Sequence, residues 1–316
     1  MREGLLRCIG GVVPPVCTPL TASGEVDLAS LADLRSYLVG AGVTGLFALG
    51  STGEAAYLTN ENRHQVVRAL SQPVADGYDP LALLVGIVEP TADRVIDALH
   101  WLDLANVDAI VVTGPFYANN SDAEIISHFE RIAADSPVPL IAYNIPVNVG
   151  YALPPGVLRE LLSRRIICGI KDSSPDLSSL RRLILSLERT DDVLLFTGSD
   201  LLLDCALQVG ANAAVAGLAN VAPAVFVQAL EAQRNHDAET LAKAQAVIAG
   251  LTRLYEPTED VSGLNSTQLG SIKTALRLLG IIEDDMVSAP MRRSSAERAD
   301  YVRTVLVECG LLPVAV

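Results

Sequence analysis

PLIAYNI (139–145) and RIICGIK (165–171) are two short runs that are apolar almost throughout. They belong to a series of such runs, and continuous apolar character is typical of parallel strands that are buried on both faces of a sheet. The series predicts eight strands, at residues 11–18, 45–50, 81–88, 107–114, 139–145, 165–171, 193–198 and 213–218.

The segments between these runs have apolar residues at helical spacing. Residues 27–42 and 60–74 are two examples, and each begins with an acidic or asparagine residue, as helices commonly do. Eight alternations of strand and helix favour an α/β fold of the (β/α)8 TIM barrel type. A doubly wound sheet is the alternative, but the glycine-rich first turn GxGxxG does not follow the first run.

The last part of the chain has helical spacing and no further strand-like run. Its helical segments cover residues 226–255, 267–280 and 295–312, with Pro, Gly and Asp-rich breaks between them. We therefore expect a barrel over residues 1–224 and a C-terminal helical region over residues 225–316 that packs on it.

Composition limits the classes of function. The 316 residues are 50% hydrophobic and carry a net charge of −14, which disfavours binding to nucleic acid phosphates. Apolar stretches are too short to span a membrane, and glycines and prolines at 10–15 interrupt any signal segment, so a cytoplasmic protein is expected. Five cysteines without a CxxC pair predict neither disulfides nor a metal site.

Lysine is rare in this chain, with three lysines against twenty arginines. Lys243 and Lys273 lie in helical patterns and are predicted to be ordinary surface lysines, whereas Lys171 ends a strand-like run. A guanidinium group stays protonated, but a desolvated lysine amine can lose its proton and attack a carbonyl group. Lys171 is therefore a candidate Schiff-base residue; the alternative is a solvated strand cap.

Further reactive side chains lie at or just after the ends of other predicted strands, and in a barrel the C-terminal strand ends form the active site. These side chains occur in GSTGE (50–54), GPFY (114–117), YN (143–144) and TGSD (197–200). An amine, phenols and hydroxyls that meet at one end of the barrel are the groups needed for carbonyl chemistry on a 2-oxo acid through a lysine imine.

Two supporting roles are expected around that amine. Tyr143, helped by Ser51, Thr52 and Tyr117, would move protons during imine formation and carbon–carbon bond chemistry. The backbone N–H groups of the 50–54 turn would bind the carboxylate, with Gly53 allowing close approach. Taken singly, these motifs could also be a glycine turn, a core tyrosine and a helix cap.

Together the motifs resemble a known family. TPL (18–20), GSTGE, GPFY, YNIP (143–146), GIKDSS (169–174), TGSD and IKTALRLLG (272–280) occur in the order found in the dihydrodipicolinate synthase and N-acetylneuraminate lyase family of pyruvate-dependent class I aldolases. The resemblance implies Lys171 as the Schiff-base lysine, Tyr143 as the proton-transfer tyrosine, and Tyr117 as a tyrosine lent across a dimer interface. It also implies a homotetramer, a dimer of dimers, that needs no cofactor beyond the covalent Lys171 imine with pyruvate.

Departures from the family pattern bear on the second substrate. The position of Asn148 is an arginine in the synthases, where it binds the carboxylate of aspartate semialdehyde, and Leu201 replaces a polar group of the sialic acid lyases. We therefore expect an aldolase that joins pyruvate to a small aldehyde or 2-oxo acid, of the 4-hydroxy-2-oxoglutarate or 2-keto-3-deoxy sugar acid type. Ser173, Asn148, Leu201 and Val215 are the candidate contacts. The alternatives are the synthase itself and a non-catalytic 2-oxo acid sensor.

Overall fold

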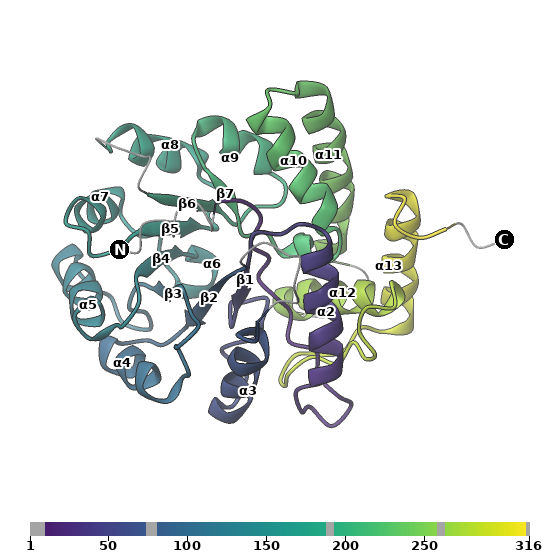
Figure 1. Cartoon of the computed structure of the whole chain (residues 1–316), viewed down its shortest axis with the longest axis horizontal. Coiled ribbons are helices and arrows are strands. Elements are labelled where there is room, and N and C mark those ends of the chain that lie inside the picture. The colour runs from purple at the N-terminus through teal and green to yellow at the C-terminus, as the bar shows by residue number, and fades with distance from the viewer. Residues whose placement is uncertain (1–9, 74–80, 188–192, 258–262, 314–316) are drawn as a thin grey trace.

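The chain folds around a curled parallel sheet. The structure, a computed structural model, describes residues 10–73, 81–187, 193–257 and 263–313. Seven parallel strands pair in the order in which they occur in the sequence. Figure 1 shows that the sheet is curled and surrounded by helices. The strands are β1 (Gly45–Ala48), β2 (Ala82–Ile87), β3 (Ala109–Thr113), β4 (Leu140–Asn144), β5 (Gly169–Asp172), β6 (Leu194–Thr197) and β7 (Ala213–Ala214).

Every residue of these strands is buried, so both faces of the sheet are covered. One face encloses a compact apolar cluster that includes Phe47, Ile141, Tyr143 and Phe196, and the other packs against the surrounding helices. This arrangement confirms the α/β class and the parallel sheet predicted from the continuous apolar runs.

The segment at 11–18, predicted as the first strand, makes only isolated bridges in the structure. Val12 bridges to Ala214 of β7, and Pro15 bridges to Phe47 of β1. The amide of Val13 donates to the carbonyl of Ala214 (2.8 Å), and the amide of Val16 donates to the carbonyl of Phe47 (2.9 Å). Pro14 and Pro15 have no N–H group, which prevents a continuous ladder here. The segment therefore contacts both edges of the curled sheet.

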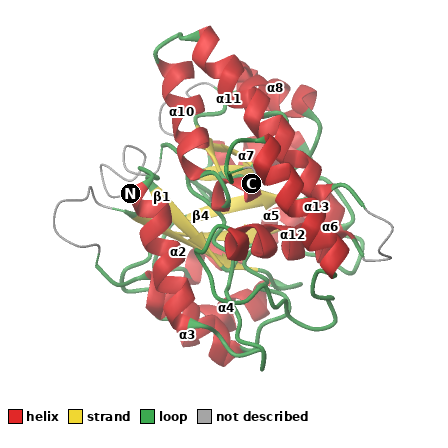
Figure 2. Ribbon diagram, turned by 90° about the vertical axis from the view of Figure 1, so that its right-hand side faces the viewer, coloured by secondary structure: helices red, strands yellow, loops and turns green. Residues whose placement is uncertain are grey.

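Helices follow the strands, and Figure 2 shows the sheet enclosed between them. The predicted helices at 27–42 and 60–74 are present, with the side chains of Asp27 and Thr59 capping their N-termini; residue 74 lies outside the described residues. The α-helices before the last quarter of the chain are α2 (Leu28–Gly40), α3 (Asn60–Leu70), α4 (Ala92–Trp101), α5 (Asp122–Asp135), α6 (Pro146–Val149), α7 (Pro155–Ser163), α8 (Leu177–Leu185) and α9 (Leu203–Val209).

From η1 (Gly217–Asn220) onward the described residues are helical or irregular. The elements are α10 (Pro223–Arg234), α11 (Ala238–Leu251), η2 (Thr252–Tyr255), α12 (Leu264–Leu278) and α13 (Ala296–Glu308). In Figure 1 they lie together on one side of the sheet.

One prediction about this region is wrong. Lys273 is not a surface lysine: its side chain is 1% exposed and forms an ion pair with Glu54. The helical pattern placed Lys273 in a helix correctly, but its partner is distant in the sequence. Lys243, by contrast, is exposed and pairs with Glu239 one helical turn away.

Four of the five cysteines lie in the described part of the chain. Cys17 and Cys168 are buried, Cys205 and Cys309 are half-buried, and all four are free thiols; Cys8 lies outside the described residues. Across 10–73, 81–187, 193–257 and 263–313, no helix has both the length and the apolar character needed to cross a membrane.

Candidate active site

Lys171 lies on β5, between β4 and β6, with its side chain buried inside the curled sheet. It is 4% exposed, and its backbone neighbours across the strands are Tyr143 and Phe196. The Nζ atom lies 3.6 Å from the centre of the Tyr143 ring and 5.8 Å from the centre of the Phe47 ring. The amine is therefore held against aromatic faces, where a cation is attracted to the ring and is also desolvated.

Burial changes the proton affinity of this amine. Removal from water lowers the pKa of Lys171 below its ordinary value of 10.5, and the neighbouring Tyr143, Asp172 and Asp200 only partly oppose the shift. A lowered pKa increases the fraction of neutral amine, which is the nucleophilic form. Lys171 is thus placed in the environment that a Schiff-base lysine requires.

Tyr143 projects from β4 beside Lys171, and its hydroxyl lies 3.5 Å from the Oγ atom of Ser51. Burial alone would raise the pKa of Tyr143, but the charge of Lys171 and hydrogen bonds with Lys171, Ser51 and Ser173 lower it below its ordinary value. The phenol is therefore in contact with groups that can exchange its proton.

The turn after β1 holds the predicted hydroxyl pair at the edge of this site. Ser51 and Thr52 are half-buried, and Gly53 is buried. The Thr18 hydroxyl donates to the Gly53 carbonyl (2.8 Å), and a Cβ atom at position 53 would lie 3.0 Å from the carbonyl of Val16. Gly53 therefore lets the turn pack closely on the segment at 11–18.

Ser173 follows β5 and contacts the amine directly. Its Oγ atom accepts a hydrogen bond from Lys171 Nζ (2.9 Å). A Cβ atom at Gly198, after β6, would lie 2.1 Å from Ser173 Oγ, a distance that real atoms do not reach. Gly198 thus leaves the space that Ser173 needs to stay against Lys171.

The structure brings Lys171, Tyr143, Ser51 and Ser173 into one group, with Val215 buried in the same apolar cluster as Tyr143. Three other candidates lie at the surface of the single chain. Asn148 is exposed on α6, Leu201 is 55% exposed, and Tyr117 is fully exposed in the loop after β3.

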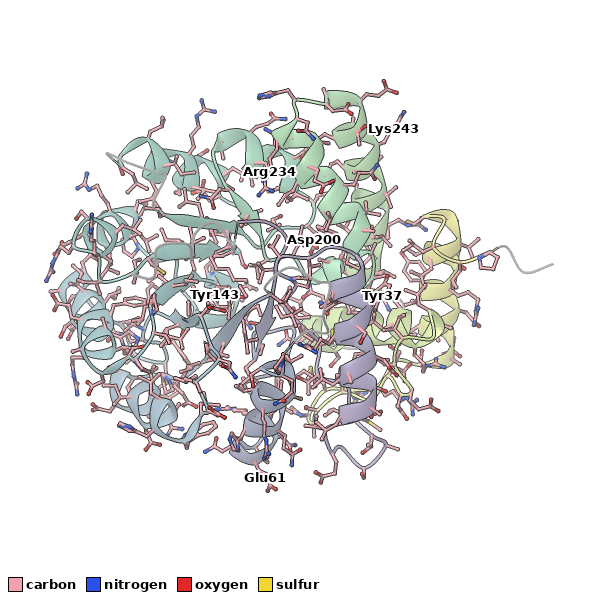
Figure 3. All side chains as sticks on the ribbon, viewed as in Figure 1. Tyr37, Glu61, Tyr143, Asp200, Arg234 and Lys243 are labelled. Carbon is pink, nitrogen blue, oxygen red and sulfur yellow. The ribbon has the colours of Figure 1, made fainter. Side chains whose placement is uncertain are left out.

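Asp200 is a further residue near the site that the sequence did not single out, although TGSD marked its strand end. Its carboxylate is buried, accepting from the Leu218 amide (2.9 Å) and the Tyr255 hydroxyl (3.1 Å). Burial raises the pKa of Asp200 to about 6. Figure 3 shows Asp200 and Tyr143 toward the middle of the molecule, whereas Lys243 and Glu61 lie at its periphery.

Comparison with known proteins agrees with this geometry. Relatives of the chain are named as lyases and aldolases, and the chain is an enzyme of this class. The chain belongs to the Dihydrodipicolinate synthetase family, whose model matches residues 8–308. Membership of an enzyme family sets the non-catalytic sensor aside.

Relatives with different names match nearly the whole chain. The putative 2-dehydro-3-deoxy-D-gluconate aldolase YagE of Escherichia coli K12 is 31% identical over 304 residues, covering 95% of this chain and 97% of YagE. The probable 2-dehydro-3-deoxy-D-pentonate aldolase YjhH of the same organism is 26% identical, covering 98% and 100%. A 4-hydroxy-tetrahydrodipicolinate synthase of Haloarcula marismortui is 29% identical, covering 94% and 92%.

Solved structures match as well. The crystal structure of YagE in complex with pyruvate has a TM-score of 0.87 at 30% identity, covering 96% of this chain and 99% of YagE. A dihydrodipicolinate synthase of Bacteroides thetaiotaomicron has a TM-score of 0.87 at 26% identity, covering 95% and 98%. The chain is therefore similar in fold both to an aldolase-named relative and to synthases.

Proposed function

We propose that this enzyme is a class I aldolase that cleaves or forms a carbon–carbon bond between pyruvate and an aldehyde. The observation that carries the proposal is the buried amine of Lys171, with its Nζ atom 3.6 Å from the Tyr143 ring centre and 2.9 Å from Ser173 Oγ. A desolvated amine beside a phenol and a hydroxyl has the groups that imine chemistry needs.

The first chemical step is imine formation. The neutral amine of Lys171 attacks the C2 carbonyl of a 2-oxo acid, and the resulting carbinolamine loses water to give a protonated imine. Tyr143, whose hydroxyl lies 3.5 Å from Ser51 Oγ, supplies the proton that the departing hydroxyl group takes up.

Cleavage then breaks the bond between C3 and C4 of the bound substrate. The C4 hydroxyl gives its proton to Tyr143, the C4 carbonyl forms, and the electron pair of the broken bond moves into the imine to give an enamine. Protonation of the enamine at C3 and hydrolysis of the imine release pyruvate and restore Lys171. Condensation is the reverse sequence.

The carboxylate of the 2-oxo acid binds at the turn that contains Ser51 and Thr52. Their hydroxyls and the backbone amides of the turn, including that of Gly53, are the donors that an anion requires at this edge of the site. Thr52 also extends the proton path from Ser51 toward solvent.

For the second substrate we propose a 2-keto-3-deoxy sugar acid, or a short relative such as 4-hydroxy-2-oxoglutarate. Two relatives with this kind of name, YagE and YjhH, support the sugar acid assignment. Asn148 stands where the sequence resemblance expects the arginine of synthases, and an amide cannot bind a carboxylate as a guanidinium does. Asn148, Ser173, Leu201 and Val215 are the proposed contacts for the aldehyde half.

The synthase that condenses pyruvate with aspartate semialdehyde is the second candidate, because relatives with that name are 28–29% identical. One assay distinguishes the aldolase from the synthase. Pyruvate release from five- and six-carbon 2-keto-3-deoxy acids is measured beside pyruvate consumption with aspartate semialdehyde. We expect kcat/KM to be at least ten-fold higher for a sugar acid, and a higher value for aspartate semialdehyde would reverse the assignment.

Several structural predictions belong to the same proposal. The segment at 11–18, which contacts both β1 and β7, would serve as the eighth strand of a (β/α)8 barrel. The division into a barrel at 1–224 and a C-terminal helical region at 225–316, the homotetramer, and the cytoplasmic location stay predictions. Fully exposed Tyr117 is proposed to act in the site of a neighbouring subunit.

A further inference from the structure

Glu54 and Lys273 form an ion pair that is shielded from solvent, with side chains 0% and 1% exposed. Glu54 belongs to the turn that contains Ser51 and Thr52, and Lys273 lies on α12, near the other end of the chain. The pair therefore connects the C-terminal helices to the hydroxyl turn of the candidate site.

Each member of the pair also binds a backbone group of one short loop. The Ser288 amide donates to Glu54 Oε2 (2.6 Å), and Lys273 Nζ donates to the Met286 carbonyl (2.7 Å). The carboxylate and the ammonium are thus both oriented by fixed partners, and three chain segments meet at one point. Charge-assisted hydrogen bonds of this kind are stronger than neutral ones.

That loop is itself held on α12. The buried carboxylate of Asp285 accepts from the Thr274 hydroxyl (3.0 Å) and from Arg277 Nε (2.9 Å), and both donors belong to α12. The positions of the Met286 carbonyl and the Ser288 amide are therefore fixed independently of Glu54. The loop and α12 together form a binding site for the Glu54 carboxylate that does not depend on Glu54 for its own geometry.

The residues on either side of Glu54 are anchored too. Gly53 accepts from Thr18, and the Ala55 carbonyl accepts from Arg63 Nε (2.8 Å). Glu54 itself has a φ of 61°, a left-handed conformation that is unfavourable for a non-glycine residue. Three consecutive anchored residues hold the backbone in this conformation.

A buried ion pair is weak evidence for a stabilising role. Replacing such a pair by uncharged groups is often neutral or stabilising, because each charge loses its hydration on burial. What the Glu54–Lys273 pair does supply is a fixed position for the turn, three residues after Ser51 and two after Thr52.

We propose that Glu54 and Lys273 are positioning residues of the active site, which hold the Ser51–Thr52 turn in the geometry that binds the substrate carboxylate and relays protons. This inference rests on the proposed aldolase function. A displacement of about 1 Å in such a group can cost about 100-fold in rate.

The test is the double variant Glu54→Gln/Lys273→Gln, which keeps hydrogen-bonding capacity and similar size but removes both charges. We expect a folded protein whose kcat/KM for pyruvate-forming cleavage falls by about 10- to 100-fold, with a raised KM for the 2-oxo acid. Amide hydrogen exchange at residues 50–55 should become faster. Where the double variant does not fold, Glu54→Asp is measured instead, with the same expected results: it keeps both charges buried as a pair but shortens the side chain by one methylene, so that the turn must shift to keep its contacts with Lys273 and the Ser288 amide.

Arg298→Gln is the matched control. Arg298 is another buried cation of the C-terminal helices, and it donates to Ser271 Oγ (2.9 Å) and to the Glu256 carbonyl (2.6 Å). We expect this variant to lower the melting temperature without changing KM or the exchange of residues 50–55.

Failure of the positioning role and failure of the aldolase proposal give different results. A folded Glu54→Gln/Lys273→Gln variant with KM, kcat and turn exchange all within two-fold of the wild type would overturn the positioning role. Hydrogen exchange reports on the turn even if the wild-type chain forms no adduct with pyruvate, and a missing adduct would count against the aldolase proposal alone.

Discussion

The Nζ atom of Lys171 lies over the ring of Tyr143, 3.6 Å from its centre, because the two residues are paired neighbours on adjacent parallel strands. Parallel pairing aligns the two side chains on the same face of the sheet, and the apolar interior removes both from water. The amine and the phenol therefore share one environment, in which the pKa of Lys171 is lowered by burial.

Replacing Lys171 by arginine should abolish activity. A guanidinium group stays protonated and cannot form the imine, although it keeps the positive charge. Borohydride treatment in the presence of pyruvate, followed by peptide mass measurement, should give an adduct on Lys171 in the wild type and none in Lys171→Arg. Lys243→Arg, at an exposed lysine, is the control and should behave as the wild type. An adduct elsewhere in the chain would contradict the assignment of Lys171.

Removing the Tyr143 hydroxyl should slow turnover more than binding. Tyr143→Phe keeps the ring against Lys171 but removes the proton donor, so kcat should fall by about 10²- to 10⁴-fold. Borohydride trapping after long incubation should still modify Lys171. Ser51→Ala should have a smaller effect in the same direction, because its Oγ atom lies 3.5 Å from the phenol as a relay. A Tyr143→Phe enzyme with unchanged kcat would remove Tyr143 from the proton path.

A methyl group at Gly198 should displace Ser173 from the amine. In Gly198→Ala the new Cβ atom would lie 2.1 Å from Ser173 Oγ, so the hydrogen bond from Lys171 must break or the strand ends must shift. We expect kcat/KM to fall, measured on purified folded protein. The double variant Ser173→Gly/Gly198→Ala removes the clash and should match the activity of Ser173→Gly. A further loss in the double variant would show that the clash is with the backbone.

Asp200 should make stability depend on pH between 3.8 and about 6. Burial raises its folded-state pKa to about 6 from an ordinary value of 3.8, so the folded state binds more protons than the unfolded state in this window. Stability contributed by protonated Asp200 is therefore present below pH 3.8 and is lost as pH rises to about 6. Asp200→Asn should make the melting temperature depend less on pH over this range. Asp93→Asn, at an exposed carboxylate, should not have this effect.

Tyr117 can be tested by mixing inactive chains. Its side chain is fully exposed in the single chain, as expected for a residue that acts in a neighbouring subunit. If Tyr117 acts in a neighbouring subunit, a mixture of Lys171→Arg and Tyr117→Phe chains should regain activity, because one hybrid site then has both intact residues. Mixed activity no greater than the sum of the separate samples, or a fully active monomer in sedimentation, would contradict the role.

The sequence determined the features that depend on local pattern. Continuous apolar runs predict buried parallel strands because both faces of the sheet are covered, and the described strands are buried throughout. Lys171 and Tyr143 could be selected because strand ends converge at one edge of such a sheet. The helix start at Asp27 was equally local, and the helix predicted from Asn60 is present, with Thr59 as the residue that caps it.

Only the tertiary structure decided contacts between segments that are far apart in the chain. The sequence pattern predicts that Lys273 is a surface lysine in a helix. In the structure it is buried, because the fold brings Glu54 to α12 as its ion-pair partner. The Asp200 carboxylate meets Tyr255, and Gly198 makes room for Ser173. Periodicity reports which face of an element is buried, but it does not report what that face meets. The partners of buried charges therefore had to come from the fold.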